Sequence, residues 1–197
     1  MWGYCHRLKL QTLLTMFLVL DTETTGVSRQ DRIVSLCWAI FDASAVQVEL
    51  QYQVIKPDGF IIPFAAAAVH GISTEQARRV GIPLRGVLER LNAAIELHAP
   101  ELYVGHNAAF DRPILLNEYL RLRLAENHST LPVYCTMRRG TTICCLPKRG
   151  RGGYKWPKLD ELHRHLFGKP HTSAHDARGD VLATAKCFFE LRRRGHM

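Results

Sequence analysis

Two carboxylates stand two positions apart, directly after an apolar run near the start of the chain. They are Asp21 and Glu23 in the stretch FLVLDTETTG (17 to 26). Because side chains two residues apart on a strand point to the same face, both carboxylates can approach one point. Such carboxylates repel each other unless a cation lies between them, and hard oxygen ligands favour Mg²⁺ or Mn²⁺. The pair indicates a metal site, although a turn in which Asp21 caps the next segment would use the same residues.

Two later acids and a histidine stand in comparable places. Asp111 ends GHNAAFD (105 to 111), just past a second apolar stretch, where a plain helix N-cap is the alternative. His175 and Asp180 lie five residues apart in HTSAHDARGDVLATA (171 to 185). Five residues turn a helix by about 500°, so these two side chains would not share one helix face. We therefore expect Asp180 in the first turns of the last helix and His175 on the loop before it.

The pattern of apolar residues predicts the elements that hold these side chains. Short apolar runs predict strands at 16–21, 32–42, 46–57, 101–107 and near 131–137. Helical spacing and cap signals predict helices after Pro63 and over 73–80, 83–98, 111–126, 158–168 and 176–194. Three strands in a meander, followed by strands that alternate with helices, predict an α/β fold with a mixed five-stranded sheet and helices on both faces. Open sheets of this kind bind ligands at the carboxyl ends of their strands, where Asp21 and Glu23 fall.

The length of 197 residues suits one domain with a full hydrophobic core, which we assign to residues 16–197. Residues 1–15 form an N-terminal extension that is a native segment, a targeting segment or the product of a misassigned start, because Met16 directly precedes the first strand. No run approaches the ~18 apolar residues of a membrane span. Six cysteines without a CxxC pair favour reduced thiols and a cytoplasmic location, and a zinc site at Cys135, Cys144 and Cys145 would fit no common spacing.

The acids and the histidine together resemble the DEDDh group of 3′→5′ exonucleases, which includes the proofreading subunit of bacterial DNA polymerase III. That family carries an apolar strand that ends in D-x-E, then an Asp after His-Asn and an aromatic residue, then H-x4-D. The corresponding stretches here are DTETTG, HNAAFD and HDARGD. The resemblance runs over about residues 16–190, and VHGIS (69 to 73) also resembles a segment of these enzymes. A sister group has Y-x3-D, which Asp176 at that position excludes.

The resemblance implies a ribonuclease H-like fold and hydrolysis of phosphodiester bonds at the 3′ end of nucleic acid, with release of nucleoside 5′-monophosphates. Two metal ions ~3.5–4 Å apart can stabilise both the attacking and the leaving oxygen. The resemblance implies two Mg²⁺ ions, for which Mn²⁺ would substitute. Asp21 would bridge them, and Glu23, Asp111 and Asp180 would complete the ligand set. His175 would be the general base, a role that suits its ordinary pKa of ~6.5.

Contacts to the substrate follow in part from the resemblance. It implies that Thr24 meets the terminal nucleotide and that His70 and Asn107 lie beside the strand being degraded. The stretch RRGTTICCLPKRGRGGYKWPK (138 to 158) has seven Lys or Arg and no acid. Cations beside aromatic residues suit single-stranded nucleic acid, and a solvated loop is the alternative. The candidate contacts in this stretch are Lys148, Arg149, Arg151 and Trp156.

The net charge of +8 and the pI near 9.4 favour a polyanionic partner. Single-stranded DNA is the favoured substrate, with RNA or short oligonucleotides as alternatives. Recruitment by a polymerase or another nucleic-acid-processing complex is a further option, and the oligomeric state is open. Two rival classes are an aspartate-nucleophile phosphatase, which would need a second Asp where Glu23 stands, and an inactive binding or polymerase-docking module. The acids Asp31, Asp42, Asp160 and Glu161 match no motif and are interpreted as surface or capping groups, with Asp176 as an N-cap.

Overall fold

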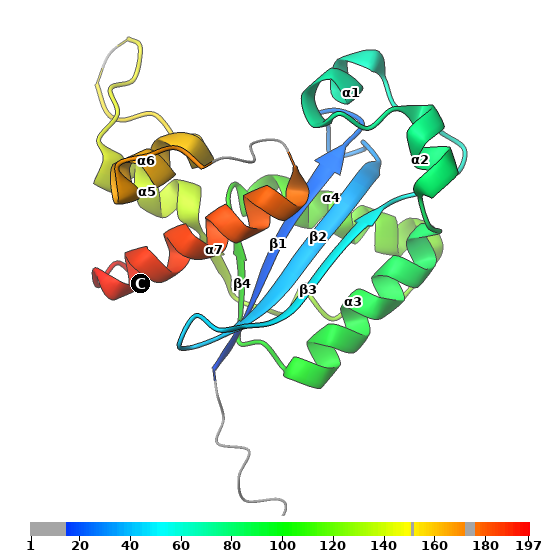
Figure 1. Ribbon diagram of the computed structural model, residues 1–197, viewed down its shortest axis with the longest axis horizontal. Helices are drawn as coiled ribbons and strands as arrows, with labels where there is room; N and C mark the ends of the chain where they lie inside the picture. Colours follow the sequence, from blue (N-terminus) through cyan, green and yellow to red (C-terminus); the bar gives the residue numbers. More distant parts are fainter. Residues whose placement is uncertain (1–14, 151, 172–175) are drawn as a thin grey trace, which may run out of the picture.

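A mixed five-stranded sheet forms the centre of the computed structural model, which describes residues 15–150, 152–171 and 176–197 (Figure 1). Residues 1–14 of the predicted extension, and also Arg151 and His175, lie outside the described residues. The strands are β1 (Met16–Thr24), β2 (Ile33–Asp42), β3 (Gln47–Val54), β4 (Leu102–Gly105) and β5 (Val133–Cys135). Their order in the sheet is β3-β2-β1-β4-β5. The predicted α/β class with a mixed five-stranded sheet is therefore confirmed.

Strand pairing explains why the sheet is mixed. β1 pairs antiparallel with β2, and β2 pairs antiparallel with β3, as a meander requires. β1 pairs parallel with β4, and β4 with β5, so each of these strands follows a crossover. β1 extends three residues beyond the predicted end, because Asp21 stays paired with Cys37 and Glu23 with Ser35 of β2. The two acids therefore lie within the paired strand, on the same face.

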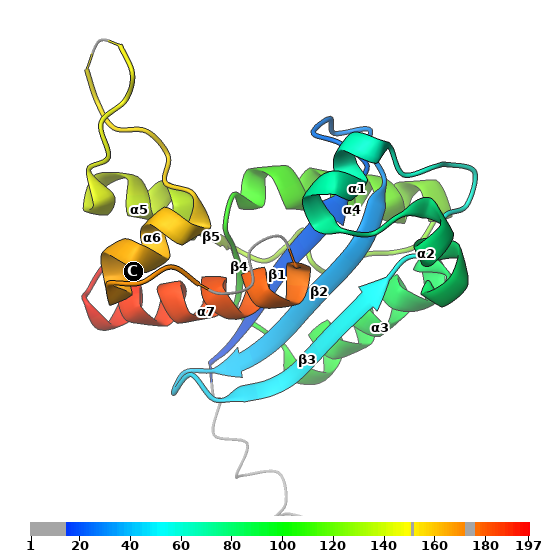
Figure 2. The same ribbon diagram turned by 45° about the horizontal axis from the view of Figure 1, so that its top comes forward.

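Helices cover both faces of the sheet, as predicted (Figures 1 and 2). The helices are α1 (Phe64–His70), α2 (Thr74–Val80), α3 (Leu84–His98), α4 (Ala108–Leu122), α5 (Thr136–Cys144), α6 (Leu159–Phe167) and α7 (Ala177–Arg193). Leu18 and Leu20 of β1 join the core beneath α3 and α4, whereas Phe17 and Val19 join the core beneath α6 and α7. This alternation with period two puts the face that carries Asp21 and Glu23 toward α7.

Helix α5 was not predicted, because its sequence is the first part of the basic stretch 138–158. The alternative of a solvated loop therefore does not apply to residues 138–144, which belong to α5. Met137, Gly140 and Cys144 are buried residues of α5, at a spacing that matches one helix face. A Cβ on Gly140 would lie 2.9 Å from Leu162 Cδ1 of α6, so the glycine allows the two helices to approach closely. None of the helices in the described part of the chain is long and apolar enough to cross a membrane.

Candidate active site

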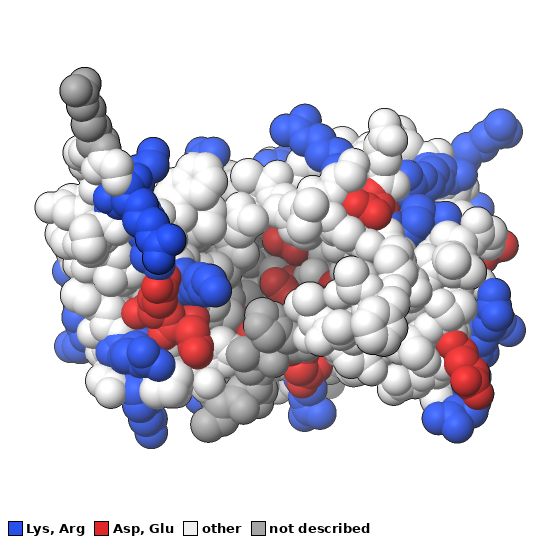
Figure 3. Space-filling model, turned by 90° about the horizontal axis from the view of Figure 1, so that it is seen from above, with Lys and Arg blue, Asp and Glu red and all other residues white. Residues whose placement is uncertain are grey.

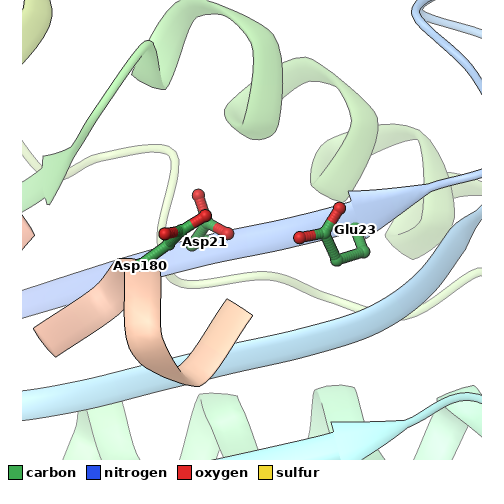
Figure 4. Close-up of side chains that lie close together, drawn as sticks. All are labelled: Asp21, Glu23 and Asp180. Carbon is green, nitrogen blue, oxygen red and sulfur yellow. The ribbon is translucent and has the colours of Figure 1, made fainter. Parts of the chain in front are cut away.

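Strand β1 and helix α7 bring three carboxylates together (Figure 4). Asp21 and Glu23 extend from one face of β1, and Asp180 extends from the first turn of α7. One oxygen of each carboxylate lies within 4.8 Å of the others, a spacing that could hold a metal ion. Among the described residues this is the one such group of acids, histidines or cysteines, so Cys135, Cys144 and Cys145 do not form a comparable site.

Helix α4 adds a fourth carboxylate to this region. Asp111 is only 3% exposed, and its Oδ1 accepts hydrogen bonds from the Thr22 backbone N–H (3.2 Å) and the Thr22 hydroxyl (2.7 Å). Asn107 is the N-cap of α4, and Asp111 follows in the first turn, so Asp111 is not a plain N-cap. Thr22 points away from Asp21 and Glu23 on β1, so the hydroxyl contact ties α4 to the opposite face of the strand end.

Burial and mutual repulsion make these carboxylates hard to ionise. Burial, followed by the charges of Asp111, Asp180 and Glu23, raises the pKa of Asp21 well above its usual range. Burial and the neighbouring acids raise the pKa of Glu23 to about 7. Burial also raises the pKa of Asp111 to about 7, even though the bonds from Thr22 favour its charged form. A bound cation would offset both effects, so the acids fit a divalent metal ion.

One further residue, His171, lies next to Asp180, and neither it nor its partner Asp160 was predicted to take part in the site. His171 Nε2 lies 3.5 Å from Oδ1 of Asp180 and also 3.5 Å from Oδ1 of Asp160. The His171 backbone N–H donates to the same Asp160 oxygen (3.2 Å). Asp160, which matched no motif, therefore holds His171 beside the acid cluster. The available signal was the position of His171 in the stretch that carries the third motif.

The described residues resume at Asp176, directly after the predicted base. His175 is outside them, so its place in the site stays a prediction. Asp176 is the N-cap of α7, and its carboxylate accepts from the Arg178 backbone N–H (3.3 Å), which confirms the predicted capping role. Asp180 lies in the first turn of α7, as predicted.

The predicted contacts to the 3′ terminus surround the end of β1 and the start of α4. Thr24 is the last residue of β1, and its hydroxyl donates to the Gly26 carbonyl (2.6 Å). His70 is the last residue of α1. Burial lowers its pKa, and a hydrogen bond with the Thr24 backbone opposes this shift. The end of α1 therefore lies against the end of β1. Asn107 has a left-handed backbone (φ 71°) at the N-cap of α4. Phe110 is partly buried and packs against the core.

The rest of the predicted basic segment lies apart from the acids. Lys148, Arg149 and Trp156 are exposed in the loop between α5 and α6, which projects from the molecule (Figure 2). The base of this loop is held by a bridge between Pro147 and Tyr154. Arg151 is outside the described residues. Of the described residues of this loop, none belongs to the group of carboxylates from β1 and α7.

The distribution of charge on this face matches a site for an anionic ligand with a cation. Acidic side chains lie in a hollow near the middle of the face, and Lys and Arg side chains lie around it (Figure 3). A metal ion in such a hollow would add positive charge where a phosphate would bind.

Comparison with known proteins gives a family model and two curated relatives. The model of the exonuclease family RNase_T matches residues 18–188. A DNA polymerase III subunit epsilon-like protein of Rhodobacter capsulatus is 32% identical over 179 residues, and an uncharacterised exonuclease, CP81, of Escherichia phage 186 is 27% identical over 186 residues. These alignments cover 89% and 86% of this chain. The chain spans 23% of the length of the first relative and 88% of the second.

Solved structures with the same fold include Exonuclease I of E. coli in complex with a dT13 oligonucleotide, with a TM-score of 0.74 and 21% identity. A zinc-bound complex of that enzyme with single-stranded DNA has a TM-score of 0.75. The similarity to each covers 91% of this chain and 41% of the other, which shows the fold. The family match contains all three motifs, and so the chain belongs to the exonuclease family RNase_T, as a DEDDh-type member of the ribonuclease H-like superfamily.

Proposed function

We propose that this chain is a 3′→5′ exonuclease that hydrolyses the terminal phosphodiester bond of nucleic acid and releases nucleoside 5′-monophosphates. The observation that carries the proposal is the convergence of Asp21, Glu23 and Asp180 within 4.8 Å, in a member of an exonuclease family. Single-stranded DNA is the favoured substrate, and the oligonucleotide complexes of the similar Exonuclease I support that choice. RNA is the alternative that the experiment below compares directly.

Asp21, Glu23, Asp111 and Asp180 would hold two divalent cations, with Mg²⁺ proposed and Mn²⁺ as a substitute. When bound, such ions stabilise the charge that develops on the attacking and leaving oxygens of a phosphodiester. The raised pKa values of Asp21, Glu23 and Asp111 support this proposal, because nearby positive charge would favour their ionised forms.

The chain's own residues would orient the acids and move the proton. Thr22 holds Oδ1 of the Asp111 carboxylate through two hydrogen bonds, which restricts the orientation of this side chain. His171 Nε2 lies 3.5 Å from both Asp160 and Asp180 and would restrict the Asp180 carboxylate. His175 would accept the proton of the attacking water, since a histidine can accept a proton near neutral pH. Thr24, His70 and Asn107 would position the terminal nucleotide.

A wider role, in a nucleic-acid-processing complex, is suggested by one of the relatives. The polymerase epsilon-like relative supports recruitment of this chain to a polymerase or another nucleic-acid-processing complex. We treat the exonuclease activity as the primary proposal, because it needs only the residues of this chain.

A labelled oligonucleotide assay tests the proposed function. Linear single strands with a 3′-hydroxyl should yield mononucleotides in Mg²⁺, whereas strands with a 3′-phosphate should resist and circular strands should remain intact. Matched DNA and RNA strands give the substrate preference. Asp21→Ala should abolish release while the free energy of unfolding without metal stays unchanged or rises, since one repulsive carboxylate is gone. Cleavage of circles would overturn the exonuclease assignment, and release of phosphate alone would indicate a phosphatase.

A further inference from the structure

A second cleft, of about 730 Å³, lies beside the N-terminal turns of α4 and is lined by four arginines. Arg29 comes from the loop between β1 and β2, and Arg112 comes from α4. Arg138 and Arg139 come from α5, the helix that the sequence did not predict. The edge strand β5 and small residues of α4 complete the walls. No acidic residue of the described chain lines this cleft.

The charges of these arginines are not compensated within the described part of the chain. Arg112 donates a hydrogen bond to the Ser129 carbonyl, and the Arg139 guanidinium lies 5.8 Å from the centre of the Tyr134 ring. In the described residues, none of the four takes part in an ion pair with a carboxylate. Guanidinium groups brought together without acids repel one another, and an anionic ligand would remove that repulsion.

The cleft borders the candidate active site through α4. Asp111 and Arg112 are consecutive residues, so their side chains diverge by about 100° around the helix. Asp111 bonds to Thr22 of β1, while Arg112 lines the cleft. Arg29 lies in the loop that leaves β1 five residues after Thr24. A chain of phosphates that reaches the carboxylates could therefore continue past α4 into the cleft.

The chemistry of the walls favours a phosphate backbone over bases. Four arginines from three separate segments suit repeated phosphates, because each guanidinium can bind a phosphate through two parallel hydrogen bonds. Tyr134 is the aromatic residue of the lining, and its side chain is 8% exposed, so it offers little surface for base stacking. Contacts to phosphates position a strand without reading its sequence.

We propose that this cleft binds the phosphodiester backbone of nucleic acid away from the scissile nucleotide. The site is separate from the exposed loop at Lys148 and Arg149, and the proposal rests on the proposed function for its substrate. The backbone comes from one of two sources. It belongs either to the upstream part of the strand being degraded or to a complementary strand paired with it.

The test uses the full chain with Arg138→Ala and Arg139→Ala combined. Arg78→Ala with Arg79→Ala is the matched control, because it removes two exposed arginines from α2 with the same change in charge. Turnover is measured on a dT20 strand, on a dT3 strand and on a duplex with a recessed 3′ end. Binding of fluorescein-labelled dT20 and of the labelled duplex is measured by anisotropy over a salt series. Circular dichroism melting checks that both variants fold.

We expect the cleft variant to raise KM for dT20 or for the duplex by on the order of tenfold, with kcat unchanged and dT3 hydrolysis unaffected. The slope of log affinity against log salt should fall by up to ~1.4 for a single strand, at ~0.7 for each phosphate that the variant no longer neutralises. Weaker binding of dT20 assigns the cleft to the upstream strand, and weaker binding confined to the duplex assigns it to the complementary strand.

Unchanged KM and salt slopes on both long substrates, equal to those of the control variant, would overturn the proposal. Failure of the proposed function gives a different result, in which wild-type protein degrades none of the three substrates. The anisotropy series needs no turnover, so it still decides whether Arg138 and Arg139 bind a nucleic-acid backbone in that case.

Discussion

Asp21 lies in a position where a charge is costly, because it is partly buried and lies near the charges of Asp111, Asp180 and Glu23. A protein without a ligand at this point would be more stable with an apolar residue there. The hydrogen bonds from Thr22 relieve this cost only for Asp111. The carboxylates are therefore understood best as groups whose charge is compensated by a bound cation.

The stability of the metal-free protein should consequently decrease as pH rises. The folded-state pKa values of Glu23 and Asp111, about 7, lie above those of the unfolded chain, so protonation favours the fold. This contribution is present below about pH 4 and is lost as the pH approaches about 7. We expect Tm in EDTA to fall between about pH 5 and about pH 8, and Mg²⁺ to raise Tm more at the higher pH.

Thermal unfolding followed by circular dichroism checks this prediction. Asp111→Asn should flatten the pH dependence, whereas Glu89→Gln, on the exposed side of α3, should leave it unchanged. An equal effect of Mg²⁺ on Tm at both pH values would contradict the assignment of these acids as ligands.

His175→Ala should lower turnover by about 10²–10⁴-fold, because it would remove the general base. The rise of kcat through a pKa near neutrality should disappear in the variant. Stabilisation by Mg²⁺ should persist, since His175 is proposed as a base and not as a ligand. His165→Ala, an exposed histidine of α6, is the control, and identical pH profiles for His175→Ala and wild type would place the base elsewhere.

The packing of α5 against α6 decides where several cations lie. Arg138 and Arg139 occupy the turn of α5 that precedes Gly140, and Gly140 has no side chain to hold α5 away from α6. The sequence shows a basic, glycine-containing stretch here, but the helix follows from the burial of Met137, Gly140 and Cys144 against neighbouring elements.

Gly140→Ala should therefore destabilise the fold although alanine favours helices. The new Cβ would lie 2.9 Å from Leu162 Cδ1 and 3.2 Å from Pro157 Cγ, and such overpacking costs roughly 1–3 kcal/mol. Gly86→Ala in α3 meets no atom within 4 Å and should stabilise by roughly 0.5–1 kcal/mol. Urea unfolding measures both, and a Gly140→Ala variant as stable as Gly86→Ala would refute the close contact of the two helices.

Across the whole molecule, positive charge exceeds negative by eight, yet acids occupy the hollow of the candidate active site. Two groups of cations lie around this region. One lines the cleft beside α4, and the other is exposed on the loop between α5 and α6. Such a field would attract a polyanion to the face as a whole, while the proposed metal site would select the bond to be cut.

The exposed loop should contribute binding but not turnover. Replacing Lys148, Arg149 and Arg151 by Ala should flatten the salt dependence of log affinity for single strands by up to about two units, with kcat nearly unchanged. Trp156→Ala should weaken binding by ~1–3 kcal/mol if a base stacks on the ring, which is 63% exposed.

Anisotropy titrations over a salt series measure these changes. The triple replacement of Arg78, Arg79 and Arg90 by Ala removes the same charge from exposed positions of α2 and α3 and serves as the control. If the slope of log affinity against log salt is the same in the loop variant and in wild type, the segment is a solvated loop that does not bind the strand.

The sequence by itself determined the sheet and the identity of the acids. The unbroken apolar run in β1 puts Leu18 and Leu20 on one face and Phe17 and Val19 on the other, so this local pattern already predicts a strand that is covered on both faces. The spacing of D-x-E and H-x4-D likewise lies within short stretches of chain, so the motifs could be recognised before any fold was known.

Only the tertiary structure decided which distant groups meet. Thr22 bonds to Asp111 across 89 positions of sequence, and no local pattern encodes that contact. His171 reaches both Asp160 and Asp180 because α6 packs on α7, and the arginine cleft forms only where α5 lies beside α4. These arrangements depend on burial and on side-chain packing between elements. The free energy of such packing is set by the whole fold and not by any single segment.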